Sequence, residues 1–259
     1  MIHHLIAEPH SIFFYLLLLI MGMGILQSVS IGGLFFFKQS GVKRGNYYYG
    51  VLLICIGLTL LHNVFVITGF YELYPAWYFL PIYYTLAFPT LLFYYVKFTL
   101  YPAYRLKISD VKHFILPGGQ FAFFVVLFFS PVAYKSQIGR DFFNPFFGAL
   151  EQLLYLTTFF AYMYFAYRYI RHKKKAMRHP KEARQIMYLS KLIEILFVLF
   201  AIHAVFVVAD FVSYDLLNIN MRDSKIYAAA GVLSFAALVF WLGTYGFQVL
   251  LWGRRVFKS

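Results

Sequence analysis

Seven apolar stretches, each about 20 residues or longer, divide the sequence and limit the folds open to it. The chain is 62% apolar, whereas soluble domains are only about half apolar. A soluble core cannot bury so many long apolar stretches, but each is long enough to cross a bilayer as a helix. The sequence therefore predicts an all-α integral membrane protein, a seven-transmembrane helix bundle that forms a single domain over residues 1–259. The stretches fall near residues 11–37, 47–69, 77–99, 112–133, 143–168, 188–214 and 226–251.

The basic residues lie mostly on one side of this predicted bundle. Of the 23 Lys and Arg residues, 19 lie in or next to the connections after the first, third and fifth stretches or in the C-terminal tail, and four lie on the other side. Cytoplasmic loops of membrane proteins are enriched in Lys and Arg. We therefore expect a multi-pass membrane protein with the N-terminus outside and the C-terminus in the cytoplasm.

Proline and glycine mark special points within the stretches. Pro81 and Pro89 lie in the third stretch, where each removes a helical hydrogen bond, so we expect this helix to be kinked or shortened. Small residues let membrane helices approach closely. The glycines of the first stretch therefore predict close packing between helices; they are Gly22, Gly24, Gly32 and Gly33.

Four ionisable side chains at membrane depth are the candidate ligand-binding residues. They are His62, Glu151, His203 and Asp210, all in the predicted outer half of their helices. Such groups are costly in hydrocarbon unless they face protein or water, and His203 and Asp210 share one helix face. The sequence predicts an outward-facing polar pocket, with ligand binding and interhelical packing as alternative roles. Glu194 points away from His203 and is expected to have a separate role.

Catalytic and metal-binding signatures are not found in the sequence. The candidate residues lack the i, i+4 spacing of a helix-borne metal motif, and the chain has no HExxH, GxSxG, phosphate-binding loop or paired Cys. We therefore expect a protein that is not an enzyme and that needs neither a metal nor another cofactor.

A basic segment between the fifth and sixth stretches, residues 171–184, is the candidate docking surface for lipids or a partner. Anionic headgroups attract such segments, and a protein partner is the other interpretation. The segment has no nucleic-acid reading motif, so no direct nucleic-acid binding is expected. Its basic residues are Arg171, Lys173, Lys174, Lys175, Arg178, Lys181 and Arg184.

The third and fourth stretches carry a pattern that resembles a known family. The segment from Leu80 to Pro117 is similar to the seven-span sensor half of membrane-bound AraC-type transcriptional regulators of Bacteroidetes. In that family a Pro and an aromatic run are followed by a basic residue, a Pro and an L-x-x-x-D-x-x-H-F-x-x-P segment. Here the matching residues are Pro89, Phe93 to Lys97, Pro102, Leu106, Asp110, His113, Phe114 and Pro117.

The resemblance implies a sensor, but without the helix-turn-helix region that follows the seventh span in those regulators. We expect a non-enzymatic membrane sensor or accessory subunit, and the resemblance places it in a bacterial inner (cytoplasmic) membrane as a multi-pass protein. It would couple an outward-facing polar pocket or partner to a cytoplasmic protein through its basic inner face, and it would belong to a protein complex in contact with membrane lipids. The alternative is a small-molecule or ion transporter or channel, in which the same polar residues would belong to a permeation path.

Overall fold

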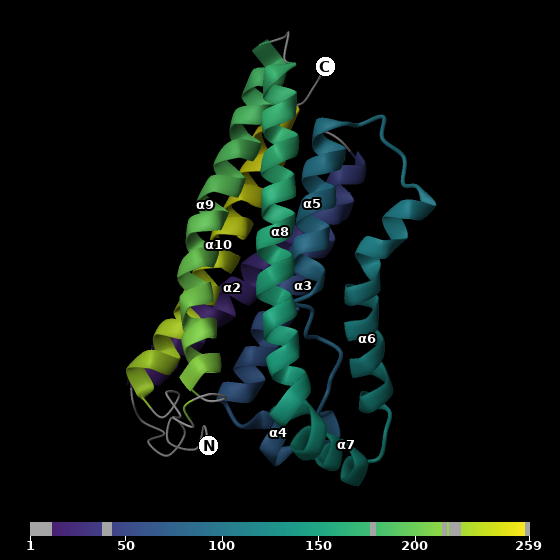
Figure 1. Cartoon of the computed structure of the whole chain (residues 1–259). Helices are drawn as coiled ribbons and strands as arrows, with labels where there is room; N and C mark the ends of the chain where they lie inside the picture. The colour runs from purple at the N-terminus through teal and green to yellow at the C-terminus, as the bar shows by residue number, and fades with distance from the viewer. Residues whose placement is uncertain (1–11, 38–42, 177–179, 214–216, 218–223, 257–259) are drawn as a thin grey trace.

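The computed structural model describes residues 12–37, 43–176, 180–213, 217 and 224–256, and the regular structure of these residues is helical. The main helices are α2 (Ile12–Phe37), α3 (Lys43–Ile67), α5 (Ala87–Leu100), α6 (Ile115–Phe128), α8 (Gly148–Lys175), α9 (Pro180–Phe211) and α10 (Lys225–Val256) (Figure 1). Of these, α5 and α6 have only 14 residues each and do not extend over the whole length of the molecule. Short elements connect them: α4 (Phe70–Leu73), η1 (Pro75–Trp77), η2 (Ile108–Phe114), α7 (Val132–Ile138) and η3 (Gly139–Phe147).

The protein is a multi-pass membrane protein. Within the described ranges, five helices are long and apolar enough to cross a bilayer: Ile12–Phe37, Lys43–Ile67, Ile108–Phe128, Ala183–Phe211 and Ile226–Leu251. The other two long segments differ from these five, because α5 has only 14 residues and α8, with 28 residues, carries more polar side chains. The prediction of a helical, multi-pass membrane protein is thus confirmed.

The two ends of the molecule differ in charge. The end at which α5 and α8 finish and α9 begins is called the basic end here, and α4 and α7 lie at the opposite end (Figure 1). Basic side chains are exposed along the segments that meet at the basic end: Lys43, Arg44, Arg105, Lys107, Lys112, Arg171, Lys174, Lys175 and Arg184. At the opposite end Lys135 is buried, and its ammonium group donates a hydrogen bond to the Ala76 carbonyl at 2.7 Å. Burial lowers the pKa of Lys135 from its usual value.

The third apolar stretch is not one continuous helix. Helix α5 begins only at Ala87, and the preceding residues 80–86 are non-helical. Phe79, just before them, has a left-handed backbone with φ of 59°. Pro89 lies in the first turn of α5, where a missing N–H costs no helical hydrogen bond. The expected shortening is therefore found, and it comes from the segment around Pro81 rather than from Pro89.

Side chains from other helices stabilise this non-helical segment. The Tyr84 N–H donates to Thr59 Oγ1 of α3 at 3.0 Å, and the Leu86 N–H donates to Gln120 Oε1 of α6 at 3.1 Å. Irregular backbone at membrane depth is tolerated where protein groups pair with its polar atoms. The break is thus part of the packed structure, with α5 buried over Phe88–Leu100.

Helices α2 and α3 approach closely at a pair of glycines. A Cβ atom added to Gly32 would lie 2.9 Å from the Gly50 carbonyl oxygen, and one added to Gly50 would lie equally close to the Gly32 oxygen. Gly24 also packs tightly against neighbouring side chains, whereas Gly22 and Gly33 have nothing within 4 Å. Two of the four glycines expected at helix contacts are therefore at such contacts.

Candidate functional site

Glu151 lies at the centre of a buried hydrogen-bond network beside the break before α5. It is in the first turn of α8 and only 3% exposed. The Thr85 hydroxyl donates to its Oε1 atom at 3.2 Å, and the Gln120 amide nitrogen bonds to the same oxygen. Gln120 Nε2 also donates to Thr85 Oγ1 at 3.0 Å. The segment before α5 and helix α6 thus each supply a hydrogen-bond donor to the carboxyl group that α8 carries.

Two tyrosines lie between the other candidate residues and this region. The His62 ring, whose Nδ1 is 2.9 Å from the Tyr71 hydroxyl oxygen, lies 4.9 Å from the Tyr83 ring centroid. Tyr155, one turn after Glu151 on α8, has its ring centroid 6.3 Å from that of His203. An aromatic contact therefore joins His203 to the part of α8 that carries Glu151, whereas His62 contacts Tyr83, three residues before the N-cap of α5.

The candidate residues nevertheless have different hydrogen-bond partners. His203 Nδ1 lies 2.9 Å from Ser234 Oγ, which joins α9 to α10. Asp210, half-buried seven residues further along α9, also has an interaction partner. The prediction that these residues bind a ligand together stays a prediction. Glu194 is exposed, in keeping with its separate position on α9.

An apolar cavity of about 500 Å³ lies between α6, α7 and η3. Its lining includes Phe123, Tyr134 and Phe142, and it contains none of the four candidate ligand-binding residues. It is therefore distinct from the polar region around Glu151. Among the described residues, no group of three His, Cys, Asp or Glu side chains is arranged to hold a metal ion.

The basic segment covers the end of α8 and the start of α9. Arg171, Lys174 and Lys175 are exposed in the last turns of α8, and Arg184 is exposed on α9. Lys173 is half-buried, with its ammonium group 5.9 Å from the Tyr101 ring centroid. Arg178 lies outside the described residues, as does the side chain of Lys181.

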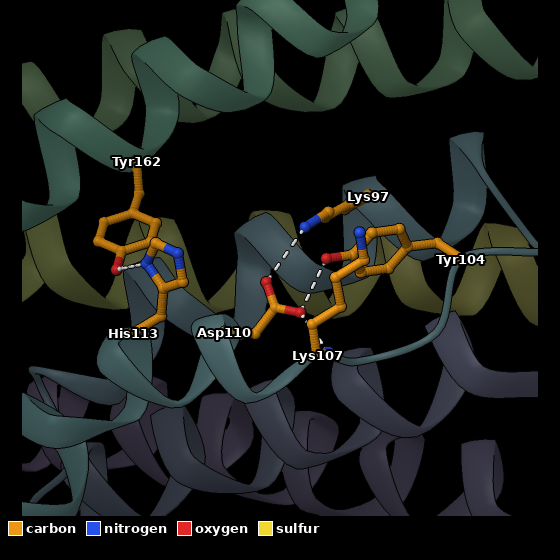
Figure 2. A network of polar contacts seen from close by, with 6 residues as sticks. All are labelled: Lys97, Tyr104, Lys107, Asp110, His113 and Tyr162. Atoms are coloured by element: carbon orange, nitrogen blue, oxygen red, sulfur yellow. Dashed lines mark hydrogen bonds and ion pairs between the residues drawn. The ribbon is translucent and has the colours of Figure 1, made fainter.

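A second polar network, at the basic end, was not recognised as a site from the sequence. Asp110 is 6% exposed and pairs with the 7% exposed Lys97, with 3.4 Å between Nζ and Oδ1. Its Oδ2 accepts hydrogen bonds from the Tyr104 hydroxyl and the Lys107 N–H, both at 2.8 Å (Figure 2). Lys97 Nζ also lies 3.8 Å from the Tyr104 ring centroid, close enough for a cation–π interaction. These four residues, the Asp110 network, fix the connection between α5 and η2.

His113 joins the same connection to α8. Its Nδ1 lies 2.6 Å from the Tyr162 hydroxyl oxygen (Figure 2). Its backbone carbonyl accepts a hydrogen bond from the Thr90 hydroxyl of α5 at 2.9 Å. Lys97, Asp110 and His113 all belong to the motif quoted for the family resemblance. That motif was the sequence signal for the Asp110 network, although it carried no indication that Lys97 and Asp110 are paired.

Comparison of the chain with protein-family models, curated proteins and solved structures finds no match.

Proposed function

We propose that this chain is a non-enzymatic sensor or accessory subunit of a bacterial inner membrane. In this proposal the chain crosses the bilayer seven times, with the basic end in the cytoplasm and the region around Glu151 toward the outside. A signal or partner at the outer side alters the helix packing, and a cytoplasmic protein bound at the basic end responds. The similarity of residues 80–117 to the sensor half of membrane-bound regulators favours this class over an enzyme.

The observation that carries the proposal is the arrangement of α8. Its first turn holds the buried Glu151, and its last turns carry the exposed Arg171, Lys174 and Lys175. One helix therefore connects a polar region at one end with a basic surface at the other. A buried polar group at membrane depth is a functional candidate. The excess of exposed basic residues favours a cytoplasmic basic end.

The basic surface provides the test of the proposal. Arg171, Lys174 and Lys175 are exposed, and because Lys174 and Lys175 follow Arg171 by three and four residues, both lie on the same side of α8 as Arg171. A variant with all three replaced by Gln should lose a cytoplasmic partner that co-purifies with the wild type in mild detergent. Thermal stability should change little, because surface substitutions away from packed features usually cost less than about 0.5 kcal/mol.

A matched control removes the same charge elsewhere. Lys43, Arg105 and Lys112 are exposed basic residues outside this segment, and replacing them with Gln should leave the partner bound. Equal retention of the partner by both triple variants would refute docking at α8. If binding to anionic vesicles were also unchanged, the segment would act in membrane topology alone.

One observation favours a transporter as the second candidate function. Discontinuous helices at membrane depth, with polar groups beside the break, are typical of secondary transporters. Residues 80–86 are a non-helical segment that precedes α5 within the third apolar stretch, and Glu151 lies beside it. Purified protein in sealed vesicles tests this candidate: ion or solute flux that depends on Glu151 supports transport, and flux equal to that of empty vesicles argues against it.

A further inference from the structure

The hydrogen bonds around Glu151 all run toward one oxygen atom. Gln120 Oε1 accepts a hydrogen bond from the Leu86 N–H. The amide nitrogen of Gln120 therefore faces Thr85 and Glu151. This nitrogen donates to Thr85 Oγ1 and to Glu151 Oε1. Because Thr85 has accepted a hydrogen bond, its own hydroxyl proton is available for Oε1. Oε1 therefore accepts two hydrogen bonds, an arrangement open both to a carboxylate and to the carbonyl oxygen of a neutral carboxylic acid.

The second carboxyl oxygen is where a proton would lie. Within the described parts of the chain, Oε2 of Glu151 takes part in no hydrogen bond. A proton on Oε2 leaves every hydrogen bond of the network unchanged. Without that proton, a negative charge would be buried beside two uncharged partners, Thr85 and Gln120, which is costly at membrane depth.

Among the residues that the structure describes, the titratable groups around this network supply no compensating positive charge from Lys or Arg. Tyr155 follows Glu151 on α8, and Tyr83 and Tyr84 precede α5. From α9, His203 contacts the Tyr155 ring and hydrogen-bonds to Ser234. The neighbouring element η3 contributes Arg140 and Asp141, which are both exposed, and α6 contributes the uncharged Gln120.

We propose that Glu151 is a proton-binding site, which holds a proton on Oε2 as a neutral acid in the folded protein at neutral pH. Release of the proton to water or another base would leave a carboxylate with both donors still on Oε1. The chemical class of the ligand is thus a proton, bound at the break before α5. This proposal goes beyond the signalling function and stands without it, because protonation is measured directly.

Infrared spectroscopy of the protein in lipid vesicles tests the proposal. At pH 7 the wild type should show the C=O band of a protonated carboxyl group, and isotopic labelling of glutamate should shift that band away from any aspartate signal. The band should vanish in Glu151→Gln. It should persist in the control Glu194→Gln, which removes an exposed carboxyl group from α9.

Stability gives a second, independent measurement. In the unfolded chain Glu151 ionises above about pH 4.3. If the folded state keeps the proton, the thermal midpoint of the wild type should fall relative to Glu151→Gln as pH rises above that value. If Glu151→Gln fails to fold, the glutamate-labelled wild type decides the question alone.

Two results would overturn the proposal. The first is a labelled wild type without any protonated glutamate band at pH 7, which means that Glu151 is ionised. The second is a thermal midpoint that rises with sodium chloride but not with choline chloride, in the wild type and not in Glu151→Gln. That result would assign a metal cation to the site in place of the proton.

Discussion

At the scale of single residues, the Asp110 network contains a buried ion pair between Lys97 and Asp110. Replacing Asp110 with Leu leaves the buried Lys97 ammonium group without its carboxylate. Loss of one partner of a buried ion pair typically costs about 3–5 kcal/mol. We expect Asp110→Leu to lower the thermal midpoint in detergent strongly. The double variant Lys97→Met with Asp110→Leu should recover much of the loss, because no unpaired charge remains buried.

Double-variant stability separates this prediction from a simple packing defect. If the double variant were as unstable as Asp110→Leu alone, the loss would come from the hydrogen bonds of Tyr104 and Lys107 rather than from the unpaired charge. Tyr104→Phe is the matched control for that contribution, since it removes one hydroxyl and keeps the ring over Lys97.

Sequence reasoning found candidate residues more readily than their partners. Glu151 was selected because a carboxyl group at membrane depth needs an explanation, and it is buried in a polar network. Its partners could not be predicted, because Thr85 lies 66 positions away in a segment that was expected to be helical. The Lys97–Asp110 pair was missed for a similar reason: the path of the connection between α5 and η2 decides which side chains meet.

At the scale of helices, α2 and α3 pack closely at the backbones of Gly32 and Gly50. A Cβ atom at Gly32 would lie 2.9 Å from the Gly50 carbonyl oxygen, and backbone cannot move aside as a flexible side chain can. We expect Gly32→Ala to destabilise the protein by about 1–3 kcal/mol, the usual cost of overpacking. Thermal unfolding in detergent measures the effect.

Gly33→Ala is the control next to it in the sequence. An added Cβ there meets nothing within 4 Å, and Ala is the better helix former by about 1 kcal/mol. The two substitutions should therefore shift the thermal midpoint in opposite directions. A loss of stability in both would mean that helix α2, rather than its contact with α3, responds to the change.

The third apolar stretch shows which features of a helix can be predicted from sequence and which cannot. Proline predicted a kinked or shortened helix, and α5 does begin late, at Ala87. The acceptors for the free backbone groups could not be read from local sequence, because Thr59 and Gln120 come from other helices. Such pairing depends on tertiary packing, which periodicity does not encode.

At the scale of the whole molecule, the distribution of basic residues between the two ends predicts the orientation in the membrane. We expect the basic end to be cytoplasmic, so a cysteine at Lys174 should react with an impermeant reagent only after cells are permeabilised. A cysteine at Gln137, exposed on α7 at the opposite end, should react in intact cells. Cys55→Ser provides the background, because Cys55 is the only native cysteine. The reverse pattern of labelling would show that the basic end lies outside the cell and that the predicted topology is wrong.

Helix α5 also constrains the order in which the membrane domain is assembled. It has 14 residues, too few to span the hydrocarbon layer, which needs about 20. It is buried by packing against α3 and α8, and its Tyr95 contacts Tyr245 of α10. During synthesis, α8 and α10 emerge from the ribosome after α5. We therefore expect α5 to pack first against α3, which is synthesised before it, and to become fully buried only after α8 and α10 have been inserted.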